Sequence, residues 1–278
     1  MNFFLIKVFI ASCLGIITVP TLSQNIMSFK EYQTIDHKEP YIYQIQLNNG
    51  KLLYFGSRHS FDPDDQQMDT LAYLFHKFEP EVVFTEAYPE KFDYSLSKQE
   101  AIRAYGEFGL IWKLSDKQNI PIHTIEPARV KEIEYLKHQG WSDAQLIIYF
   151  TLKQIAQSQG QQHSLDFAVL IPRYLASLKQ RFDLNGPLTL ETFEKFVQLL
   201  LPEVKNWQSI PQQFFYPGPQ NPEYFTNKIS TDSNNFRDKH HIVVITEAVK
   251  KGRQVFVMAG SAHSVMQEPA LRSILIEN

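Results

Sequence analysis

The chain has 278 residues, of which 44% are hydrophobic and 21% charged, a composition ordinary for a folded protein with a sizeable core. Its 27 Lys and Arg residues against 30 Asp and Glu residues give a formal net charge of −3, and they form no dense basic stripe. The composition therefore gives no support for nucleic-acid binding.

Residues 1–23 have the pattern of a signal peptide. Lys7 supplies a positive charge, an apolar run covers residues 8–19, and Pro20 ends that run. Cleavage after Ser23 would release an exported protein, periplasmic or secreted. The apolar run is shorter than the roughly 20 residues that a membrane span needs, so we expect no stable span here.

The only cysteine, Cys13, lies inside this segment, so no disulfide is expected in the rest of the chain. The stretch from Ile10 to Cys13 also resembles a lipobox. Lipidation of Cys13, which would tether the protein to a membrane, is the minor alternative to cleavage.

The next segments predict a β-hairpin followed by a strand–helix–strand unit. Residues 41–47 alternate in polarity and meet an Asn-Gly pair at 49–50, typical of a tight hairpin turn, before a strand at 51–56. Helix-spaced apolar residues then run through 68–78, and a buried type of strand covers 81–86. This order is typical of a parallel sheet.

The remaining elements extend the same α/β pattern. We expect a helix near 97–117, a strand at 120–126, a helix that starts at Ser233, a strand at 255–259 and a final helix over 269–276. The fold class is therefore α/β, with a mixed, largely parallel central sheet flanked by helices, in a single domain over residues 24–278.

Residues 128–230 differ from the rest because the strand signal disappears. Helix-spaced apolar residues occur in three stretches, 146–157, 165–182 and 190–201. We interpret this segment as a helical insertion or lid over the sheet edge, while ordinary packing of core helices explains the pattern equally well.

A short motif, Gly-Ser-x-His, occurs twice, each time directly after a strand-like run. It covers Gly56 to His59 and Gly260 to His263. We expect each glycine to allow a sharp turn with positive φ, which would place the histidine at the edge where open α/β sheets bind ligands. One such motif is weak evidence, but two in the same context predict a two-histidine site.

Two predicted strands end in carboxylates, Glu86 and Glu126. With His59 they would place three polar groups along one sheet edge, which is an arrangement typical of an active site.

These motifs follow one another in a recognisable series. In chain order they are Gly56-x-x-His59, Pro80 followed by residues 82–86 with Glu86 at the end, Arg237-Asp238 on a late helix, and Gly260-x-x-His263. The series resembles the superfamily that contains the TraB/GumN proteins, the Tiki metalloproteases, the ChaN-like haem-uptake proteins and the erythromycin esterases. The resemblance spans most of the chain, but residues 128–230 carry no matching motif.

The resemblance implies an α/β core of two halves whose Gly-x-x-His turns meet at one site. His59 and His263 would be the paired histidines, Glu86 the acidic residue and Arg237 the basic residue on a helix. Tiki-like members resemble peptidases that favour manganese or cobalt, the esterase branch is thought to need no metal, and the ChaN-like branch binds haem. Arg58 departs from the pattern of the family, because smaller residues are more usual directly before this histidine in the TraB-like proteins. A guanidinium there would bind an anionic substrate or crowd out a metal.

Two imidazoles and a carboxylate are sufficient to hold a divalent ion, Mn, Co or Zn, with an open water position. In this scheme His59, Glu86 and His263 are ligands, Glu126 is a candidate base, and Arg237 stabilises an oxyanion. We therefore expect a metal-dependent hydrolase that cleaves an amide (peptide) or ester bond. Two alternatives stay open. One is a metal-independent esterase with His59 as base and Glu86 as its orienting partner, and the other is a non-catalytic protein that binds haem or another ligand.

Several site residues also have simpler interpretations. Arg237 and Asp238 fit a solvated helix start, and Glu126 before Pro127 fits a helix cap. His240 and His241 are adjacent and so point in different directions, which favours surface positions. No G-x-S-x-G, H-E-x-x-H, P-loop or G-x-G-x-x-G motif is present.

Overall fold

The computed structural model describes residues 26–87, 92–158, 166–187 and 189–276. The predicted signal peptide at 1–23, with Cys13, lies outside these ranges. None of the helices within them combines the length and apolar character needed to cross a membrane.

The sheet starts with the predicted hairpin, which is confirmed. β1 (Tyr41–Gln46) and β2 (Lys51–Ser57) run antiparallel, with Tyr41 opposite Gly56. A hydrogen bond from Leu47 N to Gly50 O closes the turn between them at 2.8 Å.

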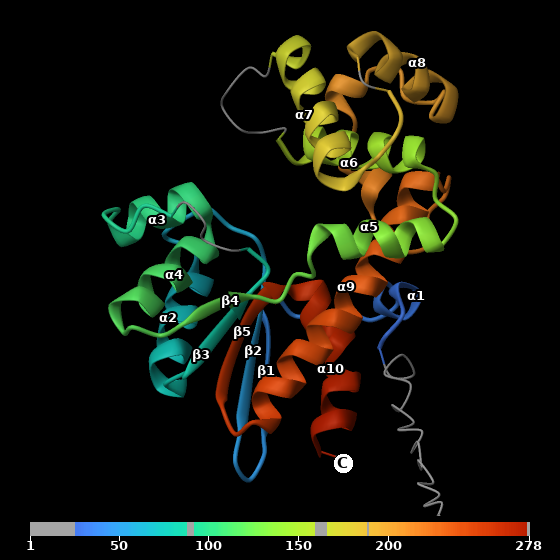
Figure 1. Cartoon of the computed structure of the whole chain (residues 1–278). Helices are drawn as coiled ribbons and strands as arrows, with labels where there is room; N and C mark the ends of the chain where they lie inside the picture. The colour runs from blue at the N-terminus through green and yellow to red at the C-terminus, as the bar shows by residue number, and fades with distance from the viewer. Residues whose placement is uncertain (1–25, 88–91, 159–165, 188, 277–278) are drawn as a thin grey trace, which may run out of the picture.

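The other strands are parallel to β2, so the α/β prediction with a mixed, largely parallel sheet is also confirmed (Figure 1). They are β3 (Val82–Thr85), β4 (Ile122–Thr124) and β5 (Gln254–Gly260). The strand order is β1-β2-β5-β3-β4, which inserts the last strand of the chain between β2 and β3. All four parallel strands therefore end at one edge of the sheet.

Alternating side chains of the strands supply two separate cores. Leu53 and Phe55 of β2 pack on one face with α2 (Gln66–Phe78), α3 (Lys98–Tyr105) and α4 (Glu107–Lys117). Leu52 and Tyr54 pack on the other face with α9 (Phe225–Lys250) and α10 (Ser261–Ile276). Because successive side chains of a strand point to opposite faces, both faces of the sheet are apolar and both are covered by helices. The result is a three-layer α/β/α arrangement.

Helices occupy the segment beyond the edge where the parallel strands end. In order they are α5 (Arg129–His138), α6 (Asp143–Ser158), α7 (Phe167–Phe182) and α8 (Leu190–Leu200), followed by two 3₁₀ turns, η1 (Trp207–Ser209) and η2 (Gln212–Phe215). They share their own hydrophobic core and lie above the strand ends (Figure 1). The helical character predicted for 128–230 is thus observed in its described parts, and its role as an insertion or lid stays a prediction.

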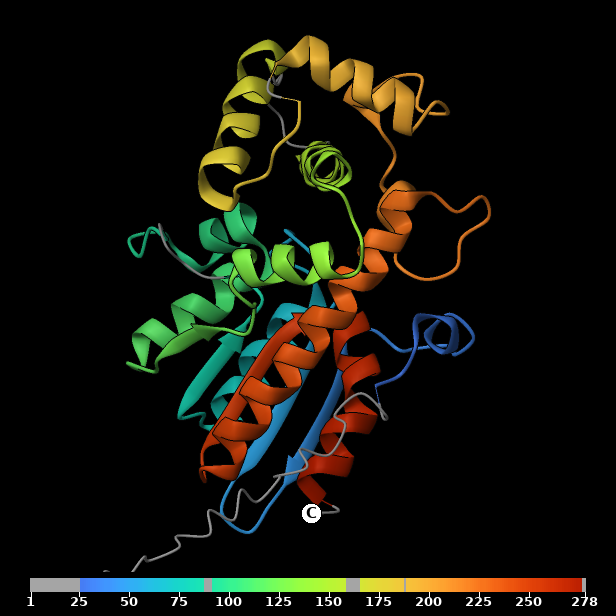
Figure 2. The same ribbon diagram turned by 45° about the vertical axis from the view of Figure 1, so that its right-hand side comes forward.

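α9 joins the two parts of the molecule. It runs from the upper helices down along the sheet (Figure 2). Ile229 near its start is buried in the core of the upper helices, whereas Ile242, Ile245 and Val249 pack on the sheet. The prediction of a helix start at Ser233 is wrong, because Ser233 lies in the third turn and donates to Glu132 of α5 instead of capping.

Three further boundaries differ from prediction. β4 covers Ile122–Thr124 instead of 120–126, so Glu126 lies two residues beyond its end. The helix expected near 97–117 is two helices, broken at Gly106, whose φ of +64° does not continue an α-helix. α10 starts at Ser261, immediately after β5, so His263 is in its first turn.

The two motif glycines also have a different role from the one predicted. Neither Gly56 nor Gly260 has a positive φ. A Cβ atom at Gly56 would collide with the side chain of Ser264 and lie 2.8 Å from the Tyr41 carbonyl oxygen. Close packing, rather than a left-handed turn, requires glycine there.

Candidate active site

Three adjacent strand ends bring the predicted ligands together. β2 and β5 are paired so that Ser57 lies opposite Gly260, and each strand is followed by its histidine. Glu86 follows β3 on the other side of β5 and accepts a hydrogen bond of 3.3 Å from Gly260 N. A Cβ atom at Gly260 would be 3.4 Å from His59 Nε2 and 3.9 Å from Glu86 Oε2. The two Gly-x-x-His motifs therefore meet beside Glu86.

His263 lies between two carboxylates. Its Nδ1 is 2.6 Å from Oδ1 of Asp238, a fully buried residue of α9, and its Nε2 is 3.1 Å from Glu86 Oε1. The contact with Glu86 has the distance of an ion pair but not the geometry of a hydrogen bond, and Glu86 Oε1 has no hydrogen-bond partner. Burial lowers the pKa of His263, but the two carboxylates outweigh it and raise that pKa.

His59 has a matching carboxylate partner, Glu107, which no sequence pattern indicated. His59 Nδ1 is 2.7 Å from Glu107 Oε1, and Glu107 also accepts hydrogen bonds from Ser57 Oγ (2.9 Å) and Ser60 N (3.2 Å). The hydrogen bond to Glu107 raises the pKa of His59. The side chain of His59 is 59% exposed, so this imidazole is accessible from the pocket.

These contacts fix the orientation of both imidazoles. An ionised carboxylate only accepts hydrogen bonds, so Nδ1 of each histidine carries the hydrogen. In the neutral ring the lone pair is then on Nε2, on the side of Glu86. This is the arrangement that orients histidine ligands in metal sites.

Glu126 and Arg237, predicted as base and oxyanion stabiliser, bind each other. Arg237 Nε and Nη2 each donate to one carboxylate oxygen of Glu126 at 2.6 Å, and Nη1 donates to Asn234 Oδ1 at 3.0 Å. Burial raises the pKa of the Glu126 carboxyl, but hydrogen bonds from His241 and Arg237 hold it well below its usual value. A carboxylate held in this way is a weak proton acceptor, so its geometry favours a role in positioning Arg237.

His241 is fully buried, so its prediction as a surface histidine is wrong. Gln267 Nε2 donates to His241 Nδ1 at 3.1 Å, which leaves His241 Nε2 to donate to Glu126 Oε1 at 3.2 Å. Burial lowers the pKa of His241, consistent with a neutral ring. The simpler interpretation of Asp238 as part of a solvated helix start is wrong for the same reason, because Asp238 lies inside α9 with no exposed surface.

Gln267 connects these groups to the core. It is fully buried in α10, donates to Asp238 Oδ1 at 2.6 Å and accepts from the Tyr54 hydroxyl at 3.0 Å. Its position four residues after His263, one helical turn away, is the sequence signal that would have placed both on one helix face.

A second histidine–carboxylate group also has the composition of a metal site. Ligand atoms of Asp238, His241 and His263 all lie within 4.8 Å of one another. Asp238 Oδ2 has no hydrogen-bond partner, but Oδ1 is already bound by His263 and Gln267, and both Asp238 and His241 are closed off from solvent. The group that opens to the pocket is His59, Glu86 and His263.

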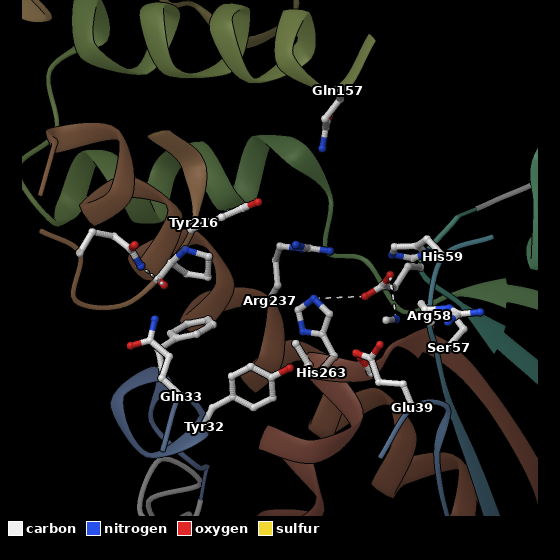
Figure 3. Close-up of a pocket in the computed structure, with 17 residues that line it drawn as sticks. Tyr32, Gln33, Glu39, Ser57, Arg58, His59, Gln157, Tyr216, Arg237 and His263 are labelled. Atoms are coloured by element: carbon white, nitrogen blue, oxygen red, sulfur yellow. Dashed lines mark hydrogen bonds and ion pairs between the residues drawn. The ribbon is translucent and has the colours of Figure 1, made fainter. Parts of the chain in front are cut away.

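The pocket over this group has a volume of about 870 Å³. In the view of Figure 3, His59 and Arg58 lie on one side of it, Tyr32 and Tyr216 on the other, and His263 and Arg237 between them. Arg58 donates to Asp65, the N-cap of α2, at 2.8 Å. Its guanidinium is therefore engaged with that carboxylate at the pocket rim.

Comparison of the chain with protein-family models, with curated proteins and with solved structures gave no match. The resemblance to the TraB/GumN and Tiki-like superfamily thus remains a hypothesis based on the motifs alone.

Proposed function

We propose that this protein is a metal-dependent hydrolase of the TraB/Tiki-like type that cleaves an amide or ester bond in the pocket above His59, Glu86 and His263. The observation that supports this most directly is the paired arrangement of the two histidines. Each has its Nδ1 held by a buried carboxylate, and both come from Gly-x-x-His motifs that meet at Glu86.

The donor set fits a divalent ion such as Mn, Co or Zn. His59 and His263 would offer Nε2, and Glu86 would offer Oε1, which lacks a hydrogen-bond partner. When bound, such an ion lowers the pKa of a water molecule and polarises a carbonyl group.

The protein's own residues orient the reaction. Glu107 and Asp238 keep the histidines in one tautomer, and the Gly260 amide holds the other oxygen of Glu86. Arg237 lines the pocket and presents positive charge to an oxyanion that develops on the substrate, while Glu126 and Asn234 fix its guanidinium.

A metal-independent hydrolase is the second candidate, favoured by the exposure of the His59 ring. His59 with its buried partner Glu107 has the geometry of a general base and its orienting group. In this version Glu107 takes the orienting role that the sequence had suggested for Glu86.

Metal content and hydrolysis, measured on the same preparations, test the proposal. Wild-type protein would be loaded with Mn, Co or Zn and compared with His59→Ala, His263→Ala and a control, His123→Ala, whose side chain is exposed on β4. We expect about one ion per chain in the wild type and control and a loss in both site variants. Peptide and p-nitrophenyl ester hydrolysis should follow the metal content.

Other outcomes separate the alternatives. Hydrolysis that survives a chelator but is lost in His59→Ala would favour the metal-independent reaction. A Soret band after haem addition, with no hydrolysis, would favour the ligand-binding alternative. A folded protein that neither binds metal nor hydrolyses any probe would contradict the proposal.

A further inference from the structure

A second, smaller cavity of about 240 Å³ adjoins the main pocket beneath α6 and α7. Glu86, Gln157 and Arg237 line both spaces. A substrate that reaches the histidines and Glu86 can therefore extend into the smaller cavity.

Three cationic side chains line this cavity, and two of them are neutralised. Arg237 is bound by Glu126, and Arg129 Nη1 lies 2.7 Å from Glu132 Oε2. Lys153 of α6 is the third. Among the residues that the structure describes, no carboxylate forms an ion pair with Lys153.

Contacts within the protein hold Lys153 in place. Its Nζ donates to the Tyr149 hydroxyl at 3.0 Å and lies 5.3 Å from the centre of the Tyr149 ring. Tyr149 is itself buried, with its hydroxyl 3.1 Å from Ser230 Oγ of α9. An ammonium group has three hydrogens to donate, and this arrangement uses one of them.

The charge of the cavity limits what Lys153 can bind. Glu86, Glu126 and Glu132 also line it, so a multiply charged anion would be repelled. A single carboxylate carries one negative charge, which matches the one ammonium group, and it is repelled less than a multiply charged anion. The cavity volume also suits a small group rather than a long chain.

We propose that Lys153 binds a free carboxylate of the substrate and thereby selects amides or esters that carry one, such as a peptide with its C-terminal residue in the smaller cavity. This inference rests on the proposed hydrolase function, since it places the scissile bond at the His59, Glu86 and His263 group. Lys153 is then a residue that determines specificity and takes no part in bond cleavage.

A matched pair of probes tests the proposal, N-acetyl-Phe-Ala with a free carboxylate and the same dipeptide as its C-terminal amide. Hydrolysis of each is measured as kcat/KM, and binding of each by calorimetry. We expect the wild type to favour the acid about tenfold or more, the effect of one charged hydrogen bond. Lys153→Gln should lose that preference because kcat/KM and affinity fall for the acid alone, and Lys153→Arg should restore part of the preference. Lys179→Gln, an exposed control on α7, should behave as the wild type.

The two measurements separate failure of the subsite from failure of the hydrolase function. If neither probe is hydrolysed, the hydrolase proposal is contradicted, and calorimetry alone decides the subsite. The subsite would be supported if the wild type binds the acid more tightly than the amide and Lys153→Gln abolishes this difference. Equal binding, no binding, or an equal loss of both probes in Lys153→Gln would overturn it, as would phosphate competing better than acetate.

Discussion

Nδ1 of His59 lies 2.7 Å from Oε1 of Glu107, a carboxylate that is only 1% exposed at the start of α4. This relationship repeats the one between His263 and Asp238 on the opposite face of the sheet, where the distance is 2.6 Å. Helices on both faces thus supply one carboxylate each to a site formed at the strand ends. The two histidines are equivalent in sequence motif and also in the way they are held.

Glu107→Gln is expected to reduce metal affinity or turnover by about 10- to 100-fold, the range typical of a lost partner behind a metal ligand. The amide keeps the size of the side chain but lacks the charge that raises the pKa of His59, so that pKa should fall. Metal titration and NMR of the His59 ring would measure both effects. Glu134→Gln, an exposed residue on α5, is the control. Unchanged affinity and an unchanged His59 pKa would argue against an orienting role for Glu107.

Local patterns were sufficient to predict the strands and the residues that follow them. Leu52 to Phe55 form a short continuous apolar run directly after the hairpin turn at 49–50, and such a run indicates a strand without knowledge of the fold. The parallel order then requires residues at strand ends, such as His59 and Glu86, to share one edge of the sheet. For this reason the proximity of the proposed ligands could be predicted from the sequence alone.

The residues that contact the proposed ligands could not be predicted in this way. Glu107 is the first residue of a helix, where an acidic side chain usually indicates only a favourable helix dipole. Its burial and its contact with His59 depend on how α4 docks against β2. Asp238 and His241 appeared exposed because a polar helix segment usually faces solvent, and the hydrogen bonds to Gln267 that permit their burial are tertiary contacts.

Gln267→Leu is expected to destabilise the fold by about 1–3 kcal/mol for each buried polar group that it leaves without a partner. Leucine is apolar and of similar volume, so Tyr54 Oη, His241 Nδ1 and Asp238 Oδ1 would each lose their contact with Gln267 without a large cavity being formed. Urea unfolding would measure the free energy of unfolding. Gln180→Leu, at an exposed position of α7, controls for the added apolar surface.

A double-mutant cycle with Tyr54→Phe separates the hydrogen bond from packing. The two substitutions should be clearly non-additive, because each removes one partner of the same bond. Additive free energies would show that Tyr54 and Gln267 contribute independently.

The two motif glycines should respond differently to alanine. At Gly56 the new Cβ atom would press against the Tyr41 carbonyl oxygen, which is backbone and cannot move aside, so Gly56→Ala should unfold at lower urea concentration. At Gly260 the nearest atom is His59 Nε2 at 3.4 Å, an ordinary contact, so Gly260→Ala should fold normally. Its methyl group would stand between His59 and Glu86 and reduce metal binding. A Gly260→Ala protein that binds metal as well as the wild type would place the ion elsewhere.

Glu126→Gln is expected to cost stability at neutral pH, towards the lower end of the about 3–5 kcal/mol measured when one partner of a buried ion pair is removed. Arg237 and Glu126 are 19% and 25% exposed, so water screens the pair only partly. The folded carboxyl has a pKa well below the usual 4.5, because hydrogen bonds from His241 and Arg237 outweigh the effect of burial. The pair therefore stabilises the fold fully above pH 4.5, and this contribution is lost as the pH falls below that value towards the folded pKa.

The difference in unfolding free energy between the wild type and Glu126→Gln should therefore be largest at pH 7 and shrink progressively below pH 4.5. Denaturant unfolding at a series of pH values measures it directly, and subtracting the variant removes the titration of all other carboxyl groups. Glu191→Gln, which breaks an exposed pair with Lys195, should show almost no such dependence. A difference that stayed constant from pH 7 to pH 3 would mean that Glu126 is not held as an ionised partner of Arg237, and the guanidinium would then lack the fixed orientation that its role at the pocket requires.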